Sequence, residues 1–520
     1  MKTTLKRPNH SSKFSVRCSG FDVLLTHLGH SHLAGVLCLA LAGEVARAQL
    51  VTNHLALPMP DLAKPPAGTS VQDPVFGTTL RRVTDAAAAG QPGLCPLYAK
   101  RQAWNADESL LLLTSGEGSL ALHDGSTYQF KRALDGVGGE DVFWHPTATN
   151  LVLYNPQNCL YAHDVLTDQE TIVCAMTNFY FADTAAEGNL SRDGRYYAVY
   201  GRDYDDTAGT VIPRAIVVMD LEARRQIAQL LLPTNLSDFD WVSISPLGNY
   251  VVVDYATELS RPFQGVEVYD RSLTNRLWQK ALGSGHSDLG VDTNGDEVLV
   301  IGIYDSDSNT TLLKKFRLRD GQETVLLPGM DWSFFNHISC RNEQRSEWCF
   351  VSTYDGEGRL TDDPASWLPF EDEIFAVKLD GSQQVQRLAH HRSRRFSPAT
   401  PDGDTSVYWA EPHATVSRQG DRILFGSNWR QNVAVVTNVD AYVCEFRQVM
   451  APQISASLSG GHLLLSWPAV NSDYSLEATP TLGPPSWTTA PEQPEVQGDR
   501  RVVTIDLPAK SRFFRLRKPL

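Results

Sequence analysis

Several common signatures of catalysis and binding are missing from this 520-residue sequence. It contains no H-E-x-x-H pair, no G-x-x-x-x-G-K-S/T loop, no G-x-G-x-x-G turn and no C-x-x-C pair. These absences exclude the common zinc-peptidase, nucleoside-triphosphate, dinucleotide and zinc-ribbon sites. Basic residues are also in deficit, with 46 Lys and Arg against 60 Asp and Glu and a net charge of −14. A chain this acidic is a poor general binder of nucleic acid, whose phosphates require cations.

Apolar runs long enough to cross a bilayer, which takes about 20 residues, are also absent from the sequence. The first 48 residues instead have the layout of a signal peptide. Five basic residues precede the short apolar stretch 34–42, and Ala46-Arg47-Ala48 forms a small-x-small cleavage pattern before Gln49. We therefore expect export to the periplasm, the cell surface or the medium; a buried helix is the alternative. Cleavage would remove six Lys/Arg and two Asp/Glu and change the net charge from −14 to −18.

Cysteines are few, and six of them lie after residue 48. An oxidising destination would favour disulfides between them. Cys159 and Cys174 flank one expected hairpin, and Cys340 and Cys349 flank another, so both pairs fit cross-strand bridges. The spacing alone leaves the connectivity open.

One pattern recurs seven times between residues 75 and 448. Each copy has a polar turn followed by a strand rich in β-branched or aromatic residues, and a second hairpin follows. The copies occupy residues 104–113, 143–154, 190–200, 244–253, 291–300, 340–351 and 416–425. Two hairpins make a four-stranded blade, so the sequence predicts an all-β, seven-bladed β-propeller over residues 75–448. We expect residues 75–83 to close the ring by pairing with residues 433–445.

The pattern changes beyond Pro452, where short strands alternate with Pro and Gly turns. Residues 452–520 are therefore expected to form a small β-sandwich, close to the lower size limit for independent folding. The ending Phe513-Phe514-Arg515-Leu516 is similar to the end of C-terminal modules of secreted bacterial proteins. That resemblance implies attachment to a cell surface or binding of sugar; a passive stabilising cap is the alternative.

Three histidines occupy matching positions in the last three repeats. His286, His337 and His413 each stand next to the strand that is expected to line the central channel. Because the innermost strands of successive blades face a common centre, we expect the three imidazoles to converge. Imidazoles with a nearby carboxylate, here Glu411, suit a divalent ion such as Mn or Zn; the alternative is three unrelated packing residues. Two further candidate ligands are Asp288 and His391.

This arrangement resembles that of the oligogalacturonate lyases, and the repeat pattern is similar to TolB-like propellers. In the lyases a manganese ion at the channel mouth is bound by His residues and a polar side chain. The resemblance implies β-elimination on uronic-acid-containing oligosaccharides, with Arg261 as the base that removes the C5 proton. The chain departs from the family where Glu411-Pro412-His413 replaces a Gln set further from the last His. The rival hypothesis is a TolB-like propeller without catalysis that binds protein or glycan partners.

Several other residues are candidates for contacting an anionic sugar. Arg341 offers a cation, and Tyr408 and Trp429 offer rings that can stack on a sugar. His391 belongs to a basic cluster from His390 to Arg395 that is a candidate cover for the channel. The alternatives are a solvated turn charge for Arg341, a solvated cluster around His391, and blade packing for the two rings.

Overall fold

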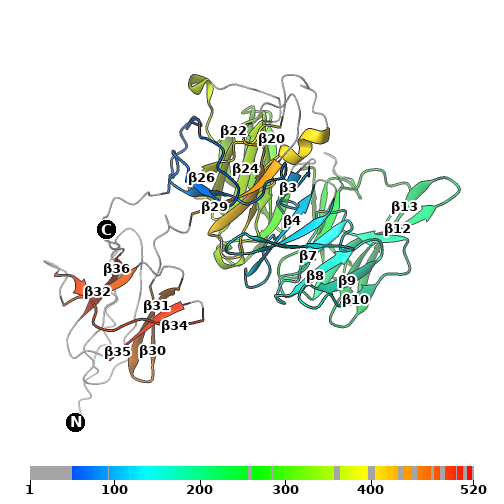
Figure 1. The fold of residues 1–520 in the computed structure, drawn as a ribbon. Helices are drawn as coiled ribbons and strands as arrows, with labels where there is room; N and C mark the ends of the chain where they lie inside the picture. The colour runs from blue at the N-terminus through cyan, green and yellow to red at the C-terminus, as the bar shows by residue number, and fades with distance from the viewer. Residues whose placement is uncertain are drawn as a thin grey trace, which may run out of the picture. The chain divides into compact units, whose positions relative to one another are not determined.

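Strands account for nearly all regular structure in the computed structural model (Figure 1). The structure describes residues 50–91, 93–115, 118–255, 261–282, 286–355, 363–395, 405–430, 439–446, 454–469, 474–480, 486–498, 500–506 and 512–517. Within these ranges there is no α-helix, and the short 3-10 helices are η1 (Glu343–Arg345), η2 (Pro364–Ser366) and η3 (Thr405–Ala410). None of the helices described is long and apolar enough to span a membrane. The predicted signal peptide, residues 1–48, lies outside the described residues.

Consecutive antiparallel strands form five four-stranded sheets in the described part of residues 141–390. The first contains β7 (Asp141–Trp144), β8 (Leu151–Asn155), β9 (Cys159–Asp164) and β10 (Glu170–Ala175). The second contains β11 (Phe181–Asp183), β12 (Tyr196–Asp205), β13 (Thr210–Asp220) and β14 (Arg225–Leu231). The third contains β15 (Trp241–Ile244), β16 (Tyr250–Asp254), β17 (Val266–Asp270) and β18 (Arg276–Lys280). The fourth contains β19 (Ser287–Val291), β20 (Glu297–Asp305), β21 (Thr310–Arg317) and β22 (Glu323–Asp331), and the fifth contains β23 (Phe334–Ser339), β24 (Trp348–Asp355), β25 (Glu373–Lys378) and β26 (Val385–His390).

A further sheet joins strands from the two ends of the same unit. Its described strands are β1 (Ser70–Gln72), β2 (Thr79–Arg82), β3 (Gly93–Cys95), β4 (Leu110–Ser115), β5 (Leu120–Asp124), β6 (Phe130–Leu134), β27 (Thr415–Val416), β28 (Arg422–Ser427) and β29 (Val439–Glu445). β2 pairs antiparallel with β29, with Thr79 opposite Glu445, and β3 pairs parallel with the same strand. The predicted pairing of residues 75–83 with the end of the propeller is thus confirmed. The all-β propeller class is confirmed as well, whereas the count of seven blades stays a prediction.

The central strands of these sheets are buried on both faces. In β16 the run Val251-Val252-Val253 is fully buried. Val251 and Val253 pack with residues of β12 and β13, whereas Val252 packs with residues of β20 and β21. Successive side chains of a strand point to opposite faces, so a sheet that packs between two neighbours needs an uninterrupted apolar run. This explains why the repeats contain continuous apolar stretches.

The β12–β13 hairpin is long for a blade, with strands of 10 and 11 residues. It extends beyond the other strands of its sheet (Figure 1). Tyr204 and Val211 lie near its tip, pair across the two strands and are exposed. Their exposure is expected, because the projecting part of a hairpin has no neighbouring sheet to cover it.

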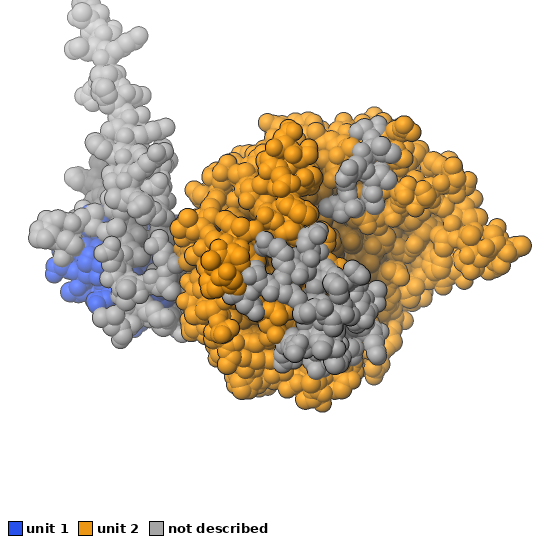
Figure 2. All heavy atoms as spheres, turned by 90° about the horizontal axis from the view of Figure 1, so that it is seen from above, with its two compact units in different colours: residues 1–48, 450–520 blue, residues 49–449 orange. Residues whose placement is uncertain are grey.

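Residues 450–520 form a compact unit separate from residues 49–449 (Figure 2). One sheet contains β30 (Ser455–Ser459), β31 (His462–Pro468), β35 (Arg500–Asp506) and β34 (Glu495–Gln497), and the other contains β33 (Thr488–Thr489), β32 (Ser475–Thr479) and β36 (Phe513–Arg517). Side chains of both sheets share one apolar core, which includes Leu465 and Trp467 from the first and Leu476 and Phe514 from the second. Two sheets around a common core are a β-sandwich, as the sequence predicts for this part of the chain.

The cysteines correct one expectation. All six after residue 48 are free thiols in the structure, so neither predicted bridge forms. Cys174 lies opposite Leu160 and faces the core, whereas Cys159 lies one residue along, opposite Ala175. Neighbouring positions on a strand face opposite sides of the sheet, which separates the two thiols. Cys340 and Cys349 are both buried among apolar side chains and pack there as thiols.

Candidate metal centre

Three imidazoles meet where three successive sheets begin. His286 directly precedes β19, His337 lies in β23, and His413 stands two residues before β27. The ring centroids of His286 and His337 are 4.3 Å apart, and those of His337 and His413 are 4.4 Å apart. The convergence predicted from the repeat positions is therefore confirmed. The backbone of His413 has a φ of +40°, in the left-handed region that side-chain-bearing residues rarely adopt.

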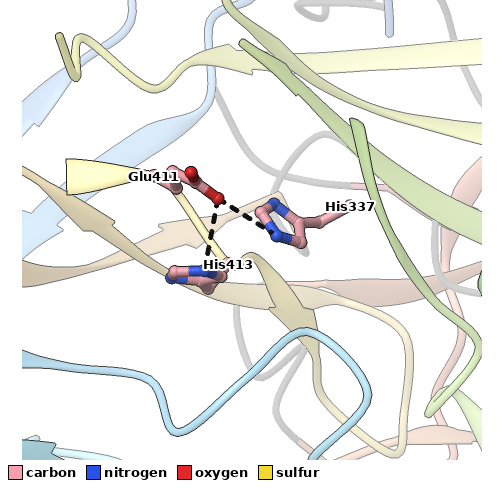
Figure 3. Close-up of side chains that lie close together, drawn as sticks. All are labelled: His337, Glu411 and His413. Carbon is pink, nitrogen blue, oxygen red and sulfur yellow. Dashed lines mark ion pairs between the residues drawn. The ribbon is translucent and has the colours of Figure 1, made fainter. Parts of the chain in front are cut away.

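Glu411 completes a cluster of ligand atoms (Figure 3). Its Oε2 lies 3.5 Å from Nε2 of His337 and 3.6 Å from Nε2 of His413. All three atoms are buried, and none of them has a hydrogen-bond partner in the described structure. Buried polar atoms without partners are costly and rare, and here three of them point at one place. A divalent ion is the group that would satisfy all three, since imidazole and carboxylate together suit Mn or Zn.

His286 is oriented to join this cluster. Its Nδ1 lies 2.7 Å from the carbonyl oxygen of Asn336, to which it donates a hydrogen bond. A proton on Nδ1 leaves the lone pair on Nε2, and a hydrogen bond of this kind typically fixes a metal-binding imidazole. His286, His337, His413 and Glu411 therefore form the candidate ligand set.

The protonation states of the three imidazoles suit metal binding, which requires neutral rings. Burial, with the neighbouring imidazoles and Arg395, holds the pKa of His337 well below its usual range. Burial likewise lowers the pKa of His413 to about 3 and lowers the pKa of His286. Burial raises the pKa of Glu411 to about 7, against the opposing effects of Arg395 and of a hydrogen bond from Tyr354. Burial thus favours the neutral form of all three imidazoles and opposes the ionised form of Glu411.

Aromatic rings enclose the three histidines. Tyr354 stacks on His337 with ring centroids 5.1 Å apart, and Tyr408 lies 4.8 Å from His413. Tyr98, from the segment between β3 and β4, lies 5.6 Å from His337 and 5.4 Å from His413. These rings desolvate the imidazoles and fix their orientation.

A cavity of about 960 Å³ leads to the cluster. The residues that connect it to the candidate metal centre are His286, Tyr354, Arg395 and Glu411. Nε of Arg395 lies 2.9 Å from Oε1 of Glu411, the carboxylate oxygen that does not face the histidines. Glu411 is thus held by a cation on one side and offers its other oxygen to the cluster.

The structure places some of the other predicted residues elsewhere. Arg341 forms a bidentate ion pair with Asp288, with Nη2–Oδ1 and Nε–Oδ2 distances of 2.7 and 3.1 Å. In this ion pair Arg341, predicted to bind a sugar, and Asp288, predicted as a metal ligand, bind each other. Tyr408, in contrast, does line the cavity.

His391, Trp429 and Arg261 also lie outside the lining of this cavity among the described residues. His391 is fully buried and bonds through Nε2 to the carbonyl oxygen of Thr353. Trp429 stacks on Tyr442 and is buried, so it is a packing ring. Arg261 is exposed at the bend before β17.

Sequence reasoning missed three residues of the site: Tyr98, Tyr354 and Arg395. Tyr98 precedes the first repeat and reaches the cluster only because the ring closes. Tyr354 lies at the end of β24, at a position with no distinctive neighbours in the sequence. Arg395 belongs to the basic cluster noted in the sequence, which was the one available signal.

Solved structures with a similar fold include two oligogalacturonate lyases. One, in complex with manganese, is 15% identical, with a TM-score of 0.51 over 77% of this chain and 98% of that chain. The other, from Vibrio parahaemolyticus, is 11% identical, with a TM-score of 0.50 over 72% of this chain and 96% of that chain. No protein-family model and no curated protein matches the sequence. At these identities the likeness shows the fold, an all-β propeller similar to that of the oligogalacturonate lyases.

Proposed function

We propose that this protein is an exported, metal-dependent lyase that cleaves uronic-acid-containing oligosaccharides by β-elimination. One observation carries the proposal. Three unpaired buried ligand atoms, on His337, Glu411 and His413, converge beside a cavity of about 960 Å³. The manganese in one oligogalacturonate lyase of similar fold supports both the metal and the reaction class.

The metal would be held by His337, His413 and Glu411, with His286 as the fourth ligand. When bound there, a divalent ion would neutralise a substrate carboxylate and stabilise the negative charge that develops at the adjacent carbon. The protein's own share is to keep the imidazoles neutral and to exclude water around them. Burial and the surrounding rings of Tyr98 and Tyr354 achieve both.

Arg395 has a second task in this proposal. It lines the cavity and holds Glu411 by an ion pair, so its guanidinium also faces the place where the substrate carboxylate would lie. A cation there would help to orient the uronate. Arg261, the base that the family resemblance implies, is exposed and lies outside the described lining of the cavity. It stays in the proposal as a prediction to be tested: an Arg261→Ala variant with intact metal binding and no elimination would support it, and one that keeps elimination would remove it.

The first experiment measures metal and elimination on the same sample. Purified protein should contain one divalent ion per chain, and a His337→Ala variant should lose it. Incubation with uronate oligosaccharides should raise the ultraviolet absorbance of the unsaturated product, and only in the metal-containing protein. A wild-type protein without metal would overturn the lyase proposal and leave a propeller that binds a protein or glycan partner. Sequencing the N-terminus of the exported protein, expected at Gln49, tests the export.

A further inference from the structure

Four large aromatic side chains are exposed around one cavity. Tyr304 is 55% exposed, Trp332 46%, Phe335 44% and Tyr408 40%. All four line the cavity that leads to the candidate metal centre. They come from three regions of the chain: β20, the β22–β23 turn with the adjoining β23, and η3. Exposed rings gathered in one hollow indicate a binding surface rather than chance exposure.

These rings continue inward to the metal ligands. Phe335 packs edge-on against Tyr354, with ring centroids 5.9 Å apart, and Tyr354 stacks on His337. The guanidinium of Arg395 lies 5.8 Å from each of the rings of Phe335 and Tyr354. A ligand that covers Phe335 would therefore have its next unit beside the cluster.

The described lining of the cavity carries few charged side chains. Among its described lining residues, the Lys, Arg, Asp and Glu side chains are Arg395 and Glu411, which pair with each other. The other lining residues are aromatic, aliphatic or neutral and polar. A carboxylate bound away from Arg395 and the cluster would lose water without gaining a cation, which is costly. The acidic chain, with a net charge of −14, opposes such a ligand as well.

The shape and chemistry of a neutral sugar fit this lining. A pyranose has apolar C–H faces that stack on aromatic rings and a rim of hydroxyls that reaches polar groups, such as Ser306, Thr311 and Asn336 in this cavity. The volume of the cavity is near the upper end of the roughly 300–1,000 Å³ common for ligand sites. It therefore has room for more than one sugar.

We infer that the cavity takes an oligosaccharide in which one uronate, at the metal centre, is flanked by neutral sugars stacked on the exposed rings. This rests on the proposed lyase function for the uronate subsite, and it extends that function to the neighbouring subsites. A polyuronate, which carries a carboxylate on every sugar, is the wrong ligand for such a lining.

Binding of two defined probes to the full-length, metal-loaded protein tests this inference. The probes are a tetrasaccharide of alternating galacturonate and rhamnose, and tetragalacturonate. Isothermal titration calorimetry at fixed salt should show at least about tenfold tighter binding of the alternating probe. Trp332→Ala and Phe335→Ala should each weaken its binding by roughly 5–30-fold, as expected for a central aromatic contact.

Tyr204→Ala is the matched control, since Tyr204 is 39% exposed but lies on the β12–β13 hairpin, away from the cavity lining. It should leave the affinity unchanged, and circular dichroism should show all three variants folded. Equal or tighter binding of tetragalacturonate would overturn the inference, and so would cavity variants that behave like Tyr204→Ala.

Failure of the lyase proposal would look different. If neither probe is eliminated but the alternating probe still binds more tightly, catalysis is refuted and the sugar site lined by aromatic rings is retained. Elimination on both probes with tighter binding of tetragalacturonate would keep the lyase and refute the neutral subsites.

Discussion

Replacing His337 with Phe should make the protein more stable than wild type in the presence of chelator and less stable than wild type in the presence of manganese. His337 is 1% exposed, and neither of its ring nitrogens has a hydrogen-bond partner in the described structure. Phe keeps a flat ring between His286 and Tyr354, which stack on His337 at 4.3 and 5.1 Å, and removes both nitrogens. The substitution therefore separates the cost of unpaired polar atoms from the loss of packing.

The expected magnitudes follow from those two roles. An unpaired buried polar atom costs about 1–3 kcal/mol, so chelated His337→Phe should be more stable than chelated wild type by at least about 1 kcal/mol. Manganese at 100 times its dissociation constant should stabilise the wild type by about 2.7 kcal/mol. The variant lacks a ligand and should gain almost nothing.

Urea unfolding followed by tryptophan fluorescence, with either chelator or manganese chloride, measures all four free energies. His337→Leu repeats the test with a side chain that does not stack. His145→Ala, at the turn after β7 and outside the cluster, should keep the full response to manganese. Equal stabilisation of wild type and His337→Phe by manganese would refute the assignment of His337 as a ligand.

Three further predictions concern the scaffold. Arg341→Ala should lower stability by about 3–5 kcal/mol in urea unfolding, because Asp288 stays buried without its partner; manganese affinity in titration calorimetry should not change. Burial and Arg392 hold the pKa of His390 well below its usual value in the folded protein. The stability that neutral, buried His390 contributes is therefore fully present above the pKa of His390 in the unfolded chain, and it is lost as the pH falls toward the pKa in the folded protein. By pH 5 this loss approaches about 2 kcal/mol relative to pH 7.5, and His390→Gln should reduce it in unfolding curves at the two pH values. Val252→Ala should cost about 1.5–3 kcal/mol in the same assay, since Val252 is fully buried between two sheets.

The propeller was predictable from the sequence because the pattern that produces it lies within short segments of the chain. Each sheet lies between two others, so runs such as Val251 to Val253 must be apolar throughout, and a polar turn must end each run. Closure was predictable for a related reason, since a strand at the start of the ring needs a partner at its end. The disulfide prediction failed because the spacing of Cys159 and Cys174 identifies the hairpin but not the face on which each thiol lies.

The site was predictable only where the repeat fixes it. His286, His337 and His413 occupy equivalent positions in successive repeats. Because the repeats are arranged around a ring, these equivalent positions lie close together in space. Trp429 is close to His413 in sequence, yet it stacks on Tyr442 and packs there. Tyr98 is far from His413 in sequence and contacts it. Contacts across the ring depend on closure and on side-chain direction, which no local pattern records.

The charge of the candidate ligands bears on how many carboxylates the site can accept. Glu411 replaces the amide that the family resemblance implies, a Gln set further from the last His, so a bound divalent ion would keep one less positive charge for the substrate. Arg395 is already paired with Glu411 at 2.9 Å. The ion and this shared guanidinium together suffice for one carboxylate, and the described cavity lining offers no second cation. Under the proposed function, selectivity for an isolated uronate would follow from Glu411, the carboxylate that would also help to hold the metal.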